Sequence, residues 1–363
     1  MPIRWLMTNV PQKTCVTSAN WTICLILLGI SFAASAAPVL PWSDEGIMAE
    51  LSRRALLMDD AIHATMLVDG LVTNKLHGEP DDVCDSLLWS SIRAASLYNM
   101  GQLDRYNEAV IALRRSTVGP GQWRRHPRCG KTLSRDMIDG LLVLAATDPV
   151  GNAATLHATA LYIQSNWGFI ASSISPTSLM SPNQGYRMRS IAAVAGIPSD
   201  DLPLVARFGE AIENYLTVLP KKGYRRHLVA MSLLQDLILW RRHDVLPPIF
   251  AAATAIRLER DNPENLLFSY LSRSFRNGGE PTRAELREIG ARLLSMPQFP
   301  ADGSLPTDCQ RSANYLWQKD ANEYVPDTVK CIETFAGIDF IWLASMITLP
   351  SHAPPRDDST IAH

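Results

Sequence analysis

The chain has 363 residues, of which 47% are hydrophobic and 19% are charged, a composition typical of globular proteins. Its formal net charge of −2 gives no electrostatic case for binding nucleic acid or an anionic membrane surface. This length is sufficient for one large domain or two smaller ones, each with its own hydrophobic core.

Residues 1–36 have the pattern of a secretory signal peptide. Arg4 and Lys13 supply positive charge without any acidic residue, and residues 21–32 form an apolar run. Small residues follow, so we expect cleavage before Ala37 and a mature protein that is periplasmic or secreted. The apolar run is shorter than the ~20 residues that span a bilayer, and an uncleaved signal anchor is the alternative.

Cysteine usage agrees with export. Four cysteines remain after cleavage, and an even number suggests two disulfides in an oxidising compartment. We predict the sequential pairs Cys84–Cys129 and Cys309–Cys331, and the other two connectivities stay open. The spacing does not match the paired Cys-x-x-Cys knuckles of a zinc site, so we predict no metal and no other cofactor.

Apolar residues recur at three- and four-residue steps along most of the chain, which is the pattern of amphipathic helices. No strand run and no hairpin signal stand out. Polar or proline-rich loops are expected at 74–82, 171–184 and 296–308. We predict helices over residues 45–72, 84–100, 104–115, 135–146, 152–167, 186–195, 202–219, 224–242, 247–260, 263–271, 283–294 and 331–346.

Many helices joined by short loops predict an all-α protein. We expect a single helical domain over residues 37–349, built from packed helical hairpins. An α/α toroid and an irregular helical bundle both fit this pattern. The charged, proline-containing tail at 350–363 is expected to be disordered.

Residues 121–137 form the most chemically dense stretch of the chain. An aromatic ring can stack on a sugar, and arginines can donate forked hydrogen bonds to a carboxylate or a phosphate. The alternative is a disulfide-pinned loop whose arginines satisfy the ends of neighbouring helices. The candidate ligand-binding residues here are Trp123, Arg124, Arg125, His126 and Arg135.

The Cys84–Cys129 disulfide would place this stretch beside a second helix start. Asp85 and Asp136 would then be neighbours, and two carboxylates can serve as general acid and base in glycoside hydrolysis. Trp89 and Arg93 follow Asp85 at four-residue intervals, so we expect them on the same helix face and assign them to substrate binding. In the alternative, each aspartate caps its helix or pairs with an arginine.

Asp339 is an acidic residue within the apolar segment 331–346. A buried carboxylate is costly unless it is paired. We interpret it as a structural partner of a buried arginine, and a buried catalytic acid is the alternative.

Two motifs resemble patterns in uncharacterised bacterial exported helical proteins. The first is Trp-x-Arg-His-Pro at 123–127 followed by Ser-Arg-Asp-Met at 134–137, and the second is Asn-Pro-x-Asn-x-x-Phe-x-Tyr-Leu at 262–271. Those proteins are similar in turn to the six-hairpin α/α toroids of many polysaccharide-active enzymes. The resemblance implies a fold, and it implies no catalytic residue.

Two functions remain open from the sequence. The first is an exported hydrolase or lyase acting on a polysaccharide, with Asp85 and Asp136 as acid and base. The second is a non-catalytic exported binding or scaffold protein that holds an anionic ligand in an arginine and tryptophan pocket. The chain has no Gly-x-Ser-x-Gly elbow, no His-Glu-x-x-His and no dinucleotide fingerprint. The substrate and the oligomeric state are not determined by the sequence.

Overall fold

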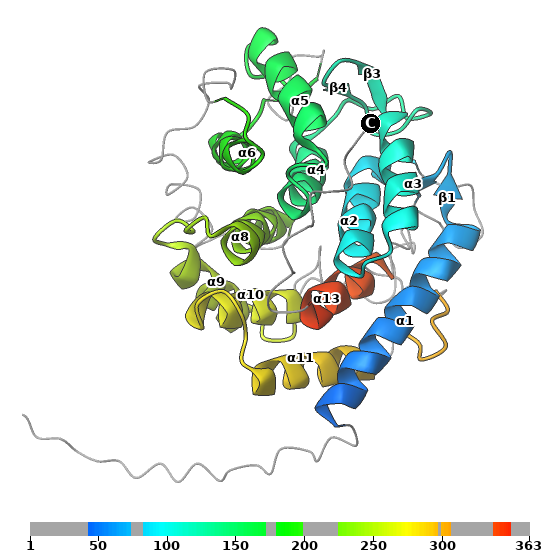
Figure 1. Cartoon of the computed structure of the whole chain (residues 1–363), viewed down its shortest axis with the longest axis vertical. Helices are drawn as coiled ribbons and strands as arrows, with labels where there is room; N and C mark the ends of the chain where they lie inside the picture. Colours follow the sequence, from blue (N-terminus) through cyan, green and yellow to red (C-terminus); the bar gives the residue numbers. More distant parts are fainter. Residues whose placement is uncertain are drawn as a thin grey trace, which may run out of the picture. The chain divides into compact units, whose positions relative to one another are not determined.

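The computed structural model describes residues 43–73, 83–171, 179–198, 224–296, 299–305 and 337–349, all within the compact unit Trp42–His363. It confirms the all-α class (Figure 1). The signal peptide, the helix at 202–219, the Cys309–Cys331 pair and the tail at 350–363 lie outside the described residues. The helices are α1 (Asp44–Thr65), α2 (Ser86–Asn99), α3 (Leu103–Arg114), α4 (Arg135–Thr147), α5 (Ala153–Ser165), α6 (Pro182–Val194), α8 (Tyr224–His243), α9 (Ala251–Asp261), α10 (Leu266–Arg276), α11 (Arg283–Ser295) and α13 (Ile338–Thr348).

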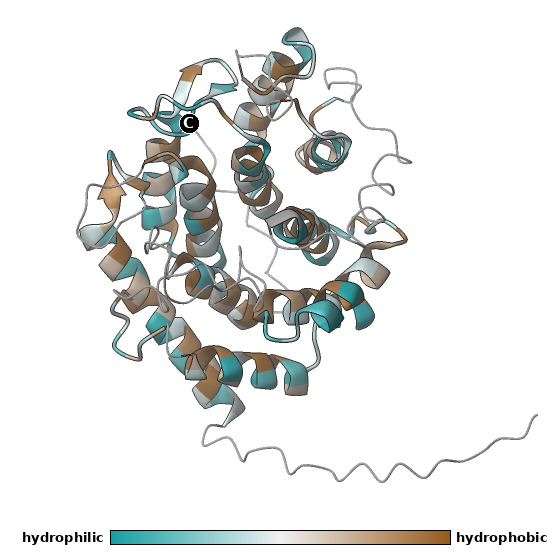
Figure 2. Ribbon diagram, turned by 180° about the vertical axis from the view of Figure 1, so that it is seen from behind, coloured by the Kyte–Doolittle hydropathy of each residue, from teal (hydrophilic) through white to brown (hydrophobic). Residues whose placement is uncertain are grey.

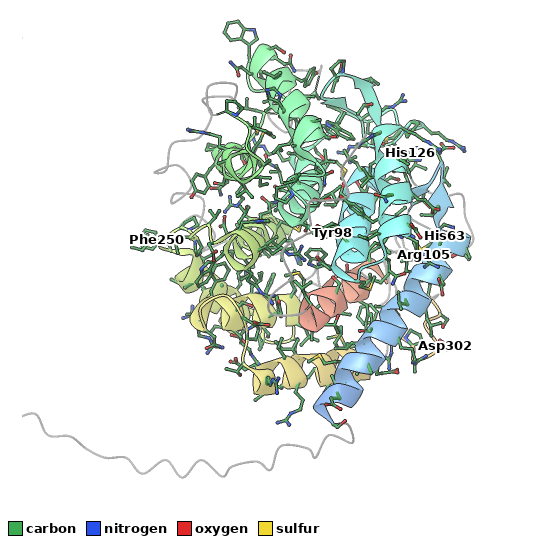
Figure 3. The ribbon with its side chains drawn as sticks, in the orientation of Figure 1. His63, Tyr98, Arg105, His126, Phe250 and Asp302 are labelled. Atoms are coloured by element: carbon green, nitrogen blue, oxygen red, sulfur yellow. A yellow bond between two sulfur atoms is a disulfide. The ribbon has the colours of Figure 1, made fainter. Side chains whose placement is uncertain are left out.

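Helices α2, α4 and α8 pack side by side, and contacts at their last turns show that they run in the same direction. At the end of α8, the Arg242 guanidinium donates to the carbonyl of Thr147, which ends α4, and to the side chain of Asn99, which ends α2. It also lies over the ring of Tyr98, which Figure 3 labels. Arg242 therefore satisfies groups at the carboxyl ends of these helices.

Helix α13 also packs on α2. Near the end of α13, the Ser345 hydroxyl accepts a hydrogen bond from the Asn99 side chain. The other helices lie around this set. Helix α1 packs on α13, α3 on α2, α6 on both α4 and α8, α9 and α10 on α8, α5 on α6, and α11 on α1 and α10. Figure 2 shows hydrophobic colour where helices face one another and hydrophilic stretches on α9 and α11. The α/α toroid stays a prediction.

Two short hairpins correct the expectation that the chain has no strands. Strands β1 (Leu67–Val68) and β2 (Leu71–Val72) pair across Asp69 and Gly70, both of which have positive φ, at 54° and 81°. An Asp-Gly pair with positive φ at both positions is the turn that hairpins favour. The predicted helix at 45–72 therefore ends early, at Thr65. The second hairpin joins β3 (Thr117–Gly119) to β4 (Gln122–Trp123).

Helix capping explains why two helices begin at other residues than the sequence predicts. Ser181 and Gln184 form a capping box and Pro182 occupies the first turn, so α6 begins inside the predicted loop at 171–184. Helix α10 begins at Leu266, because the side chain of Asn265, and not that of Asn262, accepts the hydrogen bond from the backbone of Phe268.

Candidate functional site

The dense stretch at 121–137 runs from β4 to the first turn of α4. A disulfide joins Cys84 to Cys129, with 5.3 Å between the Cα atoms, and confirms the first predicted pair. The backbone N–H of Leu87 donates to the carbonyl of Arg125 at 3.0 Å. The loop is thus fastened to the start of α2 by one covalent bond and by a backbone hydrogen bond.

Arg125 is the centre of a hydrogen-bond network between the starts of α2 and α4. Its guanidinium donates to the Asp85 carboxylate at 2.9 Å and to the Ser134 hydroxyl at 2.7 Å. It also donates to the carbonyls of Cys84 at 3.1 Å and Thr132 at 2.7 Å. All of these bonds are charge-assisted, so Arg125 holds the two helix starts together.

The two predicted catalytic carboxylates both belong to this network. Asp85 accepts from Arg125, and Asp136 accepts from the hydroxyl of Ser134, which in turn accepts from Arg125. The sequence correctly placed both aspartates at helix starts joined by the disulfide. The ion pair of Asp85 matches the alternative interpretation, in which each aspartate caps its helix or pairs with an arginine, whereas Asp136 is linked to Arg125 through the Ser134 hydroxyl.

The two predicted stacking aromatics are buried. Trp89 is 1% exposed and Trp123 is 5% exposed. The Trp123 indole nitrogen donates to Thr159 Oγ1 on α5 at 2.9 Å. A ring enclosed in this way does not present a face to a polysaccharide in solvent.

Arg93 also points into the protein. It forms a bidentate ion pair with Asp59 of α1, with Nε 2.6 Å from Oδ1, and Asp59 has no exposed side-chain surface. Arg105 on α3 completes this cluster by pairing with both Asp59 and Asp60 (Figure 3). The Arg93 side chain therefore links α2 to α1 inside the protein, which a single-helix pattern does not reveal.

The remaining predicted binding residues make contacts to the backbone. His126 is buried; Nδ1 accepts from the N–H of Arg128 at 3.0 Å, and the other ring nitrogen lies 3.1 Å from the Val68 carbonyl (Figure 3). Burial lowers the pKa of His126, so both contacts are made by the neutral ring. Arg124 donates to the carbonyl of Arg115. Arg135 donates to the carbonyl of Leu179.

Beside this network lies an apolar pocket that the sequence analysis did not predict. The space in it that is not occupied by atoms is about 490 Å³, a volume that includes open solvent at its mouth. Trp123 forms part of its wall, and the rest comes from α3, α4, α5 and α6. The lining residues are Val110, Leu113, Arg114, Trp123, Ile138, Leu141, Leu142, Leu144, Ala145, Asn152, Thr155, Leu156, Thr159 and Met188.

The polar atoms in the pocket wall are mostly satisfied within the protein. Thr159 accepts from Trp123 and donates to the carbonyl of Thr155 at 2.7 Å. The Asn152 amide donates to Tyr106 and to the carbonyl of Asp148. With these bonds made, the buried wall offers mainly hydrocarbon to an occupant.

A second buried polar cluster lies between α4, α6 and α8. Burial raises the pKa of Asp139 to about 7, although Gln184 donates to its carboxylate at 3.0 Å. Arg187 of α6 and Asp236 of α8 form a buried ion pair at 2.7 Å in the same region. The sequence analysis missed Asp139, although its position three residues after Asp136 places it on the same side of the helix.

The apolar pocket had only an ambiguous sequence signal. On α4, Ile138, Leu141, Leu142 and Ala145 recur at the spacing of one helix face. That spacing predicts burial and does not distinguish a packed core from a pocket.

Asp339 on α13 is buried, as its apolar sequence neighbours predict, with 1% of its surface exposed.

Within the residues that the structure describes, no group of three or more histidine, cysteine or acidic residues is arranged to hold a metal ion. Among the same residues, no helix combines the length and the apolar character that crossing a membrane requires.

No protein-family model matches the chain, and no curated protein matches it either. Two solved structures of the type II terpene cyclase MstE from Scytonema are similar over most of their length. One, in complex with geranylgeranyl dihydroxybenzoate, has 13% identity and a TM-score of 0.43, over 84% of this chain and 98% of the cyclase. The other, without ligand, has 14% identity and a TM-score of 0.41, over 83% and 96%. Similarity at this level carries no inference about function.

Proposed function

We propose that this protein is a non-catalytic ligand-binding protein and that the apolar pocket beside Trp123 is its binding site. The observation that carries the proposal is the pocket itself, a concave and mainly hydrocarbon surface with one side open to solvent. Pockets of this kind are where small apolar molecules bind, because their walls replace water around the ligand.

The state of the carboxylates favours binding over catalysis. Asp85 is engaged by Arg125, and Asp136 is engaged by Ser134. A general acid and base need free access to the reacting bond. The hydrolase or lyase hypothesis therefore has no geometric support from these two residues, and a saccharide ligand stays a prediction.

Export is part of the proposal. The signal-peptide pattern at 1–36 predicts it, and the Cys84–Cys129 disulfide supports it, because disulfides persist in oxidising compartments. The protein would therefore meet its ligand in the periplasm or outside the cell.

Binding of an uncharged apolar probe tests the proposal. N-phenylnaphthylamine, which fluoresces in apolar surroundings, is titrated into the purified protein. Thr155 lines the pocket and is partly exposed, so Thr155→Phe introduces a ring there without overpacking the core. We expect this variant to lose at least about tenfold in affinity, equivalent to ~1.4 kcal/mol.

Ala154→Phe is the matched control, because Ala154 precedes Thr155 on α5, is exposed and does not line the pocket. It should bind the probe as the wild type does. Equal affinity in both variants, or no binding by the wild type, would contradict the proposal.

A further inference from the structure

Arg114 is the charged residue in the pocket lining. It ends α3 and is exposed, whereas Ile138, Leu142 and Met188 are each 1% exposed. The guanidinium therefore lies where the pocket meets solvent, and the hydrocarbon wall lies deeper. Within the described residues, this guanidinium makes no hydrogen bond and no ion pair.

An arginine in the last turn of a helix ordinarily serves the helix itself by interacting with its final carbonyls. Here other groups perform that task. The carbonyls of Ala112 and Leu113 accept from the backbone N–H groups of Arg115 and Ser116, and the carbonyl of Arg114 accepts from the Thr117 hydroxyl at 2.7 Å. The end of α3 is therefore satisfied without the Arg114 side chain.

Resting on the function proposed above, we infer that the ligand is an anionic amphiphile, with its apolar part in the pocket and its acidic group on Arg114. A planar guanidinium matches the geometry of a carboxylate and donates two parallel hydrogen bonds to it.

Competition between two ligands of equal chain length tests this inference. Decanoic acid and decanol are each used to displace N-phenylnaphthylamine from the wild type, from Arg114→Gln and from Arg115→Gln. Arg115 is the matched control: it is also exposed, it does not line the pocket, and it donates to the carbonyl of Asp69.

We expect the wild type to bind the acid about fivefold more tightly than the alcohol, the size of a partly exposed ion pair. Arg114→Gln should abolish this preference and leave decanol affinity unchanged, whereas Arg115→Gln should retain it. Added salt should weaken the preference in the wild type.

Equal affinity for acid and alcohol in the wild type, or a preference that survives Arg114→Gln, would overturn the inference and leave the pocket intact as a binding site. Failure of both ligands and of the probe to bind the wild type would overturn the proposed function as well. Decyl phosphate serves as a third ligand. If it binds more tightly than decanoic acid, the acidic group on Arg114 is assigned as a phosphate in place of a carboxylate.

Discussion

The network around Arg125 and the pocket beside Trp123 are close in sequence and differ in chemistry. In the network, charged groups are matched to partners: Arg125 binds Asp85, Ser134 and two carbonyls. In the pocket, hydrocarbon surface stays uncovered, and within the described residues the Arg114 guanidinium makes no hydrogen bond or ion pair. A dense group of reactive side chains can therefore be scaffolding, while an ordinary apolar helix face lines the proposed binding site.

The difference follows from how charged and apolar side chains lower their free energy inside a folded protein. Opposite charges within reach of one another form hydrogen bonds and ion pairs, because burying them unpaired is costly. Apolar side chains on stiff helices fill space only as far as the helix spacing allows, so a gap can persist between α3, α4 and α5.

Removing the disulfide should have the largest effect on stability and little effect on binding. The double variant Cys84→Ala, Cys129→Ala opens a loop with a sequence separation of 45, which should lower the free energy of unfolding by about 4 kcal/mol. Denaturant unfolding measures this, with the reduced wild type for comparison. A variant that is as stable as the wild type and no longer binds the probe would contradict the view that the disulfide loop serves stability and the pocket serves binding.

Asp139 should make stability depend on pH. Its pKa is raised from the ordinary 3.8 to about 7, so the folded protein holds a proton that the unfolded chain releases. This contribution is fully present below about pH 4 and is lost as the pH rises through about 7. The difference between these two pKa values corresponds to about 4 kcal/mol in total.

The variant Asp139→Asn keeps the acceptor for Gln184 and cannot ionise. We expect thermal unfolding of this variant to vary less between about pH 5 and about pH 8 than that of the wild type. Asp60→Asn, at an exposed carboxylate on α1, should keep the wild-type slope. A wild type that is equally stable at both pH values would show that Asp139 is ionised throughout.

Arg125→Met tests the network directly. It should lower the free energy of unfolding by about 2 kcal/mol, because several charge-assisted hydrogen bonds of a partly buried side chain are lost. Arg128→Met in the same loop removes an ion pair with Asp69. The Arg128 side chain is 64% exposed, so this change should have a smaller effect than Arg125→Met. Equal effects would mean that Arg125 is no more structural than its exposed neighbour.

Local signals predicted much of the helical structure. The apolar periodicity and the start of α4 after Ser134 were read correctly, because both depend on residues close in sequence. The β1–β2 hairpin was readable in the same way from Asp69 and Gly70 and was missed. The Cys84–Cys129 pair was chosen from three connectivities, which spacing alone does not resolve.

The sequence by itself determined the helical class and the clustering of charge at 121–137. Only the tertiary structure decided which side chains are available for binding. Trp89 is buried, Arg93 pairs with Asp59 of α1, and Arg125 meets Asp85 across the fold. The pocket likewise depends on the spacing of four helices. Burial, pairing and empty space arise from contacts between distant segments, which periodicity along one helix does not encode.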